Sequence, residues 1–324
     1  MKLLHIEQPG RAVWKEAPMP EPKAGEVLVK VLGVTTCPHW DMHIMEGVEM
    51  IPGRALSYPY TPGEPGHEAV GDVVALGEGV DAFKAGDRVA AWRDPGTRRQ
   101  GCYAQYVAVD ADQLIKVPES LPLKSIASLE LAMCVQGSIN QLRKVDAVEG
   151  KRMCVGGLGP SGIIAVQMAR AYGAKEIIAV DPLESRRELG TQAGADVVAA
   201  PDDTALPTAR FSDNSYDSAL DSTGLKVSIE QLMKGTNDVV AIFGVLREDV
   251  IFGPGNWWGG FTLMGYGSHE RIQAEQSLEL IEKGALDLST LVTHEMPLSR
   301  YAEGVDLLRN KKALKILFLP WAEE

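Results

Sequence analysis

Cysteine is scarce in this chain, which holds 4 cysteines among 324 residues. That number is too small for a disulfide scaffold in a chain of this length, so each cysteine is weighed as a metal ligand, a nucleophile or a core residue. The chain also lacks an uninterrupted apolar run of about 18 residues, the length that a membrane-spanning helix needs. A small disulfide-rich protein and a membrane-spanning protein are both excluded.

The chain also has fewer basic than acidic residues. Lys and Arg number 32 against 44 Asp and Glu, which gives a formal net charge of −12. A surface with this balance repels nucleic-acid phosphates and anionic lipid headgroups, so we expect neither as a partner. The segment Met1–Glu7 lacks the apolar core of a secretory signal. These features predict a cytoplasmic protein.

The length and the hydrophobic pattern predict two domains. Residues 1–130 carry short alternating runs between Pro and Gly turns, which indicate an antiparallel β domain. From 131 to 267 strands and helices alternate, which is typical of a doubly wound parallel sheet. We expect residues 268–324 to return to the first domain. The predicted fold class is therefore α/β with two domains.

A glycine-rich turn follows the predicted buried strand Arg152–Gly156 and precedes a predicted helix. In this GxGxxG pattern the first glycine permits a tight turn, the second lets a pyrophosphate approach the backbone, and the third lets helix and strand pack closely. The turn predicts a dinucleotide-binding site, whose residues here are Gly157, Gly159, Pro160, Ser161 and Gly162.

Asp181 ends the next predicted strand, at the spacing expected of an acid that binds the adenosine ribose. Its carboxylate would repel the 2′-phosphate of NADP by about 4 kcal/mol, which favours NAD, although Arg186 lies near enough to counteract this preference. An ordinary turn residue is the alternative for Asp181. We expect further backbone contacts with NAD after the later parallel strands, from Thr223, Gly244 and Val245.

The segment Gly66-His67-Glu68-Ala69-Val70-Gly71, followed by Gly77 and Val80, resembles the signature of zinc-containing medium-chain alcohol and polyol dehydrogenases. The resemblance extends along nearly the whole chain. It implies a GroES-like, mainly antiparallel β catalytic domain and a Rossmann domain. It is carried further by the segments Gly25–Val31, Gly86–Val89, Gly101–Val107, the glycine-rich turn, Tyr216–Gly224 and Leu291–His294.

The family resemblance implies one catalytic zinc per chain, bound by Cys37, His67 and Cys134. Two thiolates and an imidazole form an open catalytic zinc set that leaves one position for substrate. Glu130 is the alternative third ligand, since polyol-oxidising relatives use a Glu there, and Cys134 would then be a buried residue of an apolar helix. Glu68 is expected near the metal as an alternate ligand or a support for one.

The residues after Cys37 depart from the family pattern, in which a hydroxyl two positions later relays the substrate proton. His39 occupies that position here, and its near-neutral pKa would suit it to accept the proton; a histidine without a role is the alternative. By carry-over from the family, Asp41 would brace the zinc-bound histidine and His43 would end the proton relay.

A second, structural zinc is not expected. Relatives that hold one use four closely spaced cysteines, whereas the corresponding segment 90–101 has none and Cys102 stands alone. Cys154 lies in a predicted buried strand and is interpreted as a core residue.

The sequence as a whole predicts a zinc-dependent dehydrogenase that transfers a hydride between a small alcohol, polyol or carbonyl compound and NAD. The resemblance also implies a homodimer or a homotetramer. A zinc-free NADPH quinone or enone reductase is the alternative within enzymes, although Cys37 and His67 argue against it. A non-catalytic NAD-binding protein of the same fold is the second alternative, because the relay motif is altered.

Overall fold

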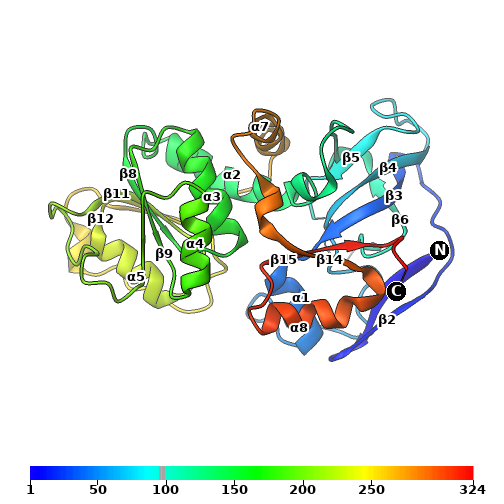
Figure 1. Ribbon diagram of the computed structural model, residues 1–324, viewed down its shortest axis with the longest axis horizontal. Helices are drawn as coiled ribbons and strands as arrows, with labels where there is room; N and C mark the ends of the chain where they lie inside the picture. The colour runs from blue at the N-terminus through cyan, green and yellow to red at the C-terminus, as the bar shows by residue number, and fades with distance from the viewer. Residues whose placement is uncertain (95, 97–98, 324) are drawn as a thin grey trace. The chain divides into compact units, whose positions relative to one another are not determined.

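The computed structural model describes residues 1–94, 96 and 99–323 (Figure 1). The chain divides into two compact units. The first unit combines Met1–Leu131 with Asp287–Glu324, and the second is the continuous segment Ala132–Leu286. The helix α2, Leu129–Arg143, contains the boundary between them.

The first unit is built on a seven-stranded, mainly antiparallel sheet. Six strands follow the order β14-β15-β3-β4-β5-β7, and β6 also pairs with β3. A separate hairpin of β1 and β2 accompanies the sheet. The strands are β1 Lys2–Gln8, β2 Arg11–Glu16, β3 Glu26–Thr35, β4 Glu68–Leu76, β5 Arg88–Ala91, β6 Tyr106–Asp110, β7 Leu114–Lys116, β14 Val292–Pro297 and β15 Lys315–Leu319; the helices are α1 Pro38–Glu46 and α8 Tyr301–Arg309.

The core of the first unit joins residues from both ends of the chain. Valines of β3 alternate toward it, and Phe318 of β15 packs its ring against Tyr103 and Tyr301 at centroid distances of 5.8 and 5.6 Å. All three aromatic rings are fully buried. The C-terminal strand therefore completes a core that the first third of the chain begins.

The second unit is a doubly wound parallel sheet with the order β10-β9-β8-β11-β12-β13. Its order reverses between β8 and β11, and in such sheets ligands bind beyond the carboxyl ends of the strands at this reversal. Its strands are β8 Arg152–Gly156, β9 Glu176–Val180, β10 Val197–Ala199, β11 Tyr216–Asp221, β12 Thr236–Ile242 and β13 Thr262–Met264; its helices are α3 Pro160–Ala171, α4 Glu184–Gln192, α5 Lys226–Gly235, α6 Pro254–Trp257 and α7 Arg271–Glu282.

These two architectures confirm the predicted fold class. The segment that returns to the first unit begins at Asp287, whereas the sequence placed that boundary after residue 267. Helix α7 accounts for the difference, because Asn140 of α2 donates a hydrogen bond of 2.7 Å to Gln276 and keeps α7 with the second unit.

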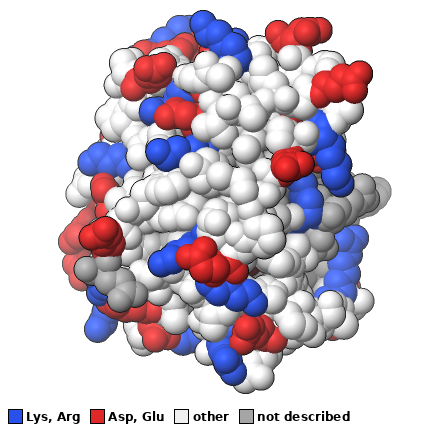
Figure 2. Space-filling model, turned by 90° about the vertical axis from the view of Figure 1, so that its right-hand side faces the viewer, with Lys and Arg blue, Asp and Glu red and all other residues white. Residues whose placement is uncertain are grey.

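Two surface properties bear on possible partners. Figure 2 shows one face of the molecule, on which acidic and basic side chains are interspersed without a continuous region of one sign. Among the described residues, no helix combines the length and the apolar character needed to cross a membrane.

Neighbouring residues of β4 provide a test of this packing. Val73 is 1% exposed in the core, whereas Val74 is 39% exposed on the opposite face. We predict that Val73→Ala lowers the free energy of unfolding by about 2–3 kcal/mol through lost burial and a cavity. The control Val74→Ala should change it by less than about 0.5 kcal/mol. Equal effects in chemical denaturation would contradict this register of β4.

Candidate metal and cofactor sites

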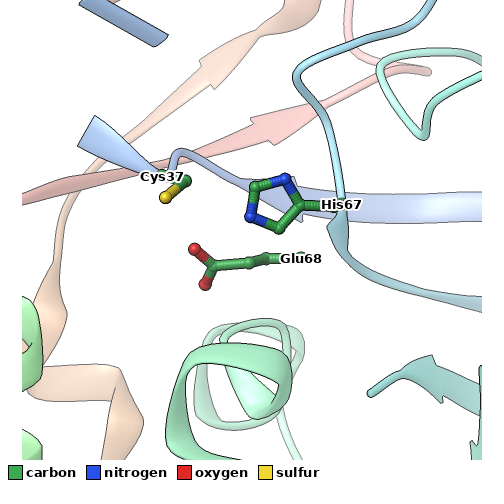
Figure 3. A group of neighbouring side chains, drawn as sticks. All are labelled: Cys37, His67 and Glu68. Atoms are coloured by element: carbon green, nitrogen blue, oxygen red, sulfur yellow. The ribbon is translucent and has the colours of Figure 1, made fainter. Parts of the chain in front are cut away.

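The pairing of β3 with β4 brings the first metal-donor residues together. Thr35 lies opposite Glu68 in this antiparallel pair. Cys37 follows β3 and caps α1, while His67 directly precedes β4. One donor atom each of Cys37, His67 and Glu68 lies within 4.8 Å of the others, and the side chains converge in Figure 3.

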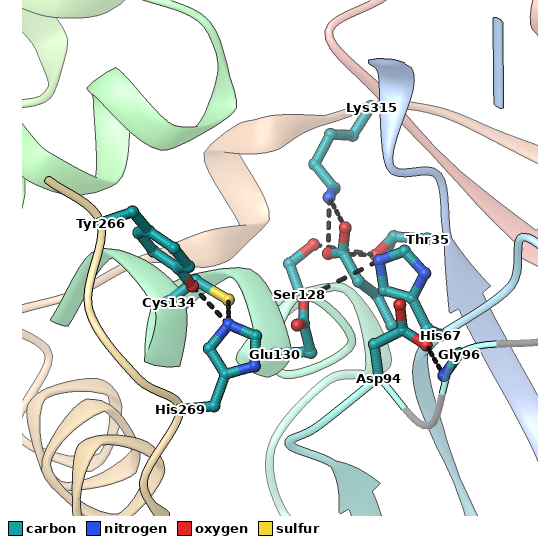
Figure 4. Close-up of polar contacts among 11 residues, drawn as sticks. Thr35, His67, Asp94, Gly96, Ser128, Glu130, Cys134, Tyr266, His269 and Lys315 are labelled. Carbon is teal, nitrogen blue, oxygen red and sulfur yellow. Dashed lines mark hydrogen bonds and ion pairs between the residues drawn. The ribbon is translucent and has the colours of Figure 1, made fainter. Parts of the chain in front are cut away.

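Glu130, in the first turn of α2, is a further carboxylate next to His67. Its Oε2 lies 3.9 Å from Nε2 of the histidine, and both side chains are buried (Figure 4). Thiolate, imidazole and carboxylate are the ligands that zinc takes in proteins, and two donors on one tetrahedral zinc lie roughly 3.3–3.7 Å apart. The donor set of this unit therefore fits a zinc ion.

The electrostatics of the set favour a cation. Burial raises the pKa of the Cys37 thiol, and a hydrogen bond with His67 opposes that rise. Burial alone would lower the pKa of His67, but Asp94, Cys37 and Glu130 outweigh it and raise the pKa well above its usual value. The imidazole is thus surrounded by groups that carry or develop negative charge.

Glu68 is held by an ion pair that sequence analysis missed. Nζ of Lys315 lies 2.6 and 2.5 Å from the two carboxylate oxygens, both side chains are fully buried, and Thr35 donates a further bond of 3.2 Å (Figure 4). The signal for Lys315 was present in the sequence as a single charge in the apolar run 313–319. A lysine at such a position needs a buried anionic partner.

Asp41 is fully buried, but its hydrogen bonds go to tyrosines. Its Oδ1 accepts from the hydroxyls of Tyr103 and Tyr301 at 2.8 Å each, and Oδ2 has no partner among the described residues. Burial raises the pKa of Asp41 to about 7. The brace on the zinc-bound histidine stays a prediction.

The two histidines of α1 lie at its accessible side. His39 is exposed, and its ring meets that of His43 edge-on at 5.9 Å. Nδ1 of His43 lies 3.3 Å from the carbonyl oxygen of Glu49. The structure brings the two predicted relay residues together, and their roles in proton transfer stay predictions.

Glu64 and Asp94 form a second group of acids next to His67. Donor atoms of Glu64, His67 and Asp94 are within 4.8 Å of one another, and all three line a cavity of about 320 Å³ within the first unit. Burial and the neighbouring Asp94 raise the pKa of Glu64 to about 8. Sequence analysis did not single out either acid, because neither stands in the zinc signature.

Cys134, predicted as the third zinc ligand, belongs to the second unit. Its Sγ lies 3.6 Å from Nε2 of His269, and the hydroxyl of Tyr266 contacts the same nitrogen (Figure 4). Cys134 is therefore part of a thiol, imidazole and phenol cluster of that unit, and its role as a zinc ligand stays a prediction.

The glycine-rich turn has the contacts that its pattern requires. Gly157 has a φ of 87°, and a Cβ there would lie 2.5 Å from Cγ2 of Thr223. A Cβ on Gly162 would lie 1.9 Å from the carbonyl oxygen of Gly157. A Cβ on Gly159 would meet nothing within 4 Å, directly before Pro160 at the start of α3. Open space in front of a helix N-terminus suits a phosphate group.

Asp181 ties this turn to the end of β9. Its Oδ2 accepts a hydrogen bond of 2.8 Å from the backbone N–H of Leu158, and its Oδ1 accepts one of 2.8 Å from Leu183. Each oxygen retains a lone pair for a ribose hydroxyl. Burial lowers the pKa of Arg186, and the charge of Asp181 acts in the opposite direction.

The remaining predicted cofactor residues lie after β11 and β12, at the carboxyl edge of the sheet. Oγ1 of Thr223 donates a hydrogen bond of 2.7 Å to Oδ1 of Asp221. A Cβ on Gly244 would lie 2.0 Å from the backbone nitrogen of Gly224, so the two loops pack backbone to backbone. Val245 continues the second loop and is exposed. Ser161 lies in the first turn of α3.

A zinc-type donor set in an antiparallel β unit and a pyrophosphate-type turn in a doubly wound sheet define a metal-dependent, dinucleotide-dependent oxidoreductase. Two family profiles match the chain: an alcohol dehydrogenase GroES-like domain over residues 23–119, and a zinc-binding dehydrogenase domain over residues 160–283. Together they cover more than half of the chain.

Individual relatives agree with the profiles. The chain is 27% identical to the L-threonine 3-dehydrogenase of Pyrococcus horikoshii, with 94% of each chain covered. Two solved structures are each 24% identical with a TM-score of 0.83. They are the 2R,3R-butanediol dehydrogenase of Bacillus subtilis, covering 98% of this chain and 99% of that one, and the galactitol-1-phosphate dehydrogenase of Escherichia coli, covering 99% and 100%.

The chain belongs to the family of zinc-containing medium-chain alcohol and polyol dehydrogenases. It is accordingly an NAD(P)-dependent oxidoreductase that acts on CH–OH groups and uses zinc. The family resemblance, the enzyme class and these cofactors, as predicted from sequence, are confirmed.

The glycine contacts generate a paired prediction. Gly162→Ala should lower the free energy of unfolding by about 1–3 kcal/mol or more, because its Cβ meets backbone that cannot move aside. Gly159→Ala changes only a helix cap, so it should lower the free energy of unfolding by less than about 1 kcal/mol. It should nevertheless weaken NADH binding about tenfold or more. Thermal unfolding and NADH fluorescence titration separate the two effects. Normal NADH affinity in Gly159→Ala would contradict the assigned phosphate site.

Proposed function

We propose that this enzyme oxidises small alcohols or polyols with NAD, and that Cys37, His67 and Glu130 hold its catalytic zinc. The observation that carries the proposal is the 3.9 Å separation of Nε2 of His67 and Oε2 of Glu130, beside the group that His67 forms with Cys37 and Glu68. Glu130 is thus proposed in place of Cys134, which the resemblance favours as the third ligand and which is now the alternative. The oxidation converts an alcohol and NAD⁺ into a carbonyl compound, NADH and a proton.

Zinc in this set would supply Lewis acidity at the substrate oxygen. Residues of the chain position the metal-donor groups and transfer the proton. Lys315 neutralises Glu68 and fixes its carboxylate beside the donor set. We assign His39 to accept the proton that the alcohol releases, with His43 next to it on α1 as the following carrier.

NAD is proposed over NADP. The support is the buried carboxylate of Asp181, whose backbone hydrogen bonds fix it at the end of β9, beside the glycine-rich turn. A 2′-phosphate would approach this charge at the cost of a Coulomb repulsion. The positive charge of Arg186 would reduce that repulsion. We therefore expect a preference for NAD over NADP and not a complete exclusion of NADP.

We also propose that the enzyme acts in the cytoplasm as a homodimer or homotetramer. Exposed aromatic and aliphatic side chains of the second unit support the assembly, since such patches are typical of interfaces. They include Phe211, Ile251, Phe252, Trp257 and Trp258, which are 50 to 78% exposed.

Metal analysis tests the zinc assignment. We predict one zinc per chain, lost in His67→Ala and in Glu130→Ala together with turnover, while Cys134→Ser keeps the metal. Each variant should retain its circular dichroism spectrum, because His67 and Glu130 lie at the ends of β4 and α2 and Cys134→Ser replaces only one atom. Zinc loss in Cys134→Ser with retention in Glu130→Ala would reverse the choice of third ligand. Two zinc ions per chain would contradict the absence of a structural site, and a zinc-free active protein would favour the reductase alternative.

Cofactor kinetics test the role of Asp181. The unaltered enzyme should show a higher kcat/KM with NAD than with NADP, and Asp181→Ser should narrow or reverse this ratio mainly through KM. The reason is that the carboxylate contacts only the adenosine half of the cofactor. Equal use of both cofactors by the unaltered enzyme would contradict the assignment.

Turnover of His39→Ala tests the proton acceptor. We predict a decrease in kcat of about a hundredfold or more, the usual contribution of a positioned base, with zinc content unchanged. His39→Ser should recover part of the loss. Full activity in His39→Ala would assign the proton to water or to His43.

A further inference from the structure

Asp221, the last residue of β11, is a buried carboxyl group to which the proposed chemistry gives no role. The residue is fully buried at the carboxyl edge of the parallel sheet. Its Oδ2 accepts hydrogen bonds of 3.2 and 2.7 Å from the backbone N–H groups of Thr223 and Gly224. Its Oδ1 accepts bonds of 2.7 and 2.8 Å from the hydroxyls of Thr223 and Ser228. The carboxyl group therefore organises the loop between β11 and α5.

A charge at this place is costly for the fold. Burial raises the pKa of Asp221, and the hydrogen bonds from Thr223, Gly224 and Ser228 oppose that rise. Well-packed apolar groups stabilise a core as well as a buried charge does. Stability of the sheet alone therefore does not require a carboxyl group here, which indicates that its hydrogen bonds serve to hold the loop in one conformation.

The backbone of Asp221 also holds the loop that follows β12. Its carbonyl oxygen accepts hydrogen bonds of 2.8 and 3.1 Å from the N–H groups of Phe243 and Gly244. Gly224 has a φ of 69°, and a Cβ there would lie 2.3 Å from the carbonyl oxygen of Val245. The loops after β11 and β12 thus pack directly against each other, and both are bonded to Asp221.

The loop after β11 also contacts the glycine-rich turn. The hydroxyl of Ser222 donates to the carbonyl oxygens of Gly156 and Gly157, at 3.0 and 2.8 Å. Cγ2 of Thr223 is the atom that a Cβ on Gly157 would meet. Strands β8, β11 and β12 are neighbours in the sheet (Figure 1). Three loops of the carboxyl edge therefore meet around Asp221.

The strand order indicates which half of a dinucleotide these loops face. The turn after β8 is the assigned pyrophosphate site, and Asp181 after β9 is the proposed site of the adenosine ribose. The adenosine half then lies on the side of β9 and β10. An extended dinucleotide bound across the reversal between β8 and β11 places its nicotinamide half beyond β11 and β12.

We propose that Asp221 is a positioning residue for the nicotinamide half of the cofactor. Its oxygens are bonded to the loop, so it acts through Thr223 and Gly224 and, by its carbonyl group, through Gly244. Loops that are already ordered before the cofactor binds lower the cost of binding. The inference rests on the proposed place of the adenosine half, and it requires neither the zinc ligands nor the alcohol substrate.

Calorimetric titration of the zinc-containing enzyme with NADH and with ADP tests the proposal. ADP has the adenosine and both phosphates but lacks the nicotinamide riboside. In Asp221→Asn one acceptor oxygen becomes an NH2 group, which offers hydrogens to groups that are themselves donors. We predict that the Kd of NADH rises about tenfold or more and that the Kd of ADP changes less than about twofold.

Two further variants separate positioning from a general loss of structure. Asp217 lies near the other end of β11, and its Oδ2 accepts a hydrogen bond of 2.8 Å from the backbone N–H of Arg152. Asp217→Asn is therefore the matched control and should leave both Kd values unchanged. Ser228→Ala removes one donor to Asp221 from α5 and should weaken NADH binding about threefold, with ADP binding unchanged.

The double variant of Asp221→Asn and Ser228→Ala tests whether the serine acts through Asp221. Both changes remove parts of one hydrogen-bonded cluster, so their effects on NADH binding should not add. The Kd of NADH should stay within about twofold of that for Asp221→Asn alone. Full multiplication of the two single effects would contradict a role of the serine through Asp221.

The remaining outcomes decide the proposal in every case. Equal weakening of NADH and ADP in Asp221→Asn would mean a general loss of the site and would overturn it. Unchanged NADH binding with a lower Tm would make Asp221 a purely structural residue. If Asp221→Asn does not fold, Ser228→Ala decides alone, and unchanged NADH binding there overturns the proposal. Selective loss of NADH binding, in an enzyme for which no alcohol reduces NAD, would remove the proposed function and keep the role of Asp221.

Discussion

The antiparallel pairing of β3 and β4 is the constraint on which the chemistry of the first unit depends. It places Thr35 opposite Glu68, so that the residue two positions after one strand and the residue just before the other contribute donors to one site. A shift of the register by one residue would turn every side chain of β4 to the opposite face of the sheet. The buried ion pair of Glu68 with Lys315 adds a penalty to any such shift, because it would leave a charge buried without its partner.

The second unit positions its site differently, through glycines that have no side chain. Gly157 and Gly162 allow backbone to approach backbone at distances that a Cβ would obstruct, and Gly159 leaves room for a ligand. Asp181 then links the turn to the neighbouring strand. The first unit organises charge through side chains, and the second presents backbone N–H groups at a helix end.

Sequence analysis predicted what depends on local pattern. The change from alternating to βαβ periodicity indicated both architectures, and the GxGxxG and GHE segments located Gly157–Gly162 and His67. It missed Lys315 and the tyrosine partners of Asp41, because those contacts join residues that are far apart in the chain and follow from topology alone.

The spacing of residues in the sequence also does not distinguish Glu130 from Cys134 as the third zinc ligand. The two residues are four positions apart on α2, so they lie on the same face of the helix, one turn from each other. Only the contacts separate them, since Glu130 approaches His67 and Cys134 approaches His269. Glu64 was missed because a lone acid in a loop carries no periodic signal.

The order of the two units along the chain affects how the protein folds during its synthesis. The second unit is one uninterrupted segment, whereas the first needs β15, which is made after that whole segment, to pair with β3 and to bring Lys315 to Glu68. On the ribosome, the nascent first unit holds Glu68 without its cation and an unfilled aromatic core while the whole second unit emerges and folds. Assembly of the metal-binding unit therefore waits until the second unit has been made, and during that period the chain is most exposed to aggregation and most dependent on chaperones.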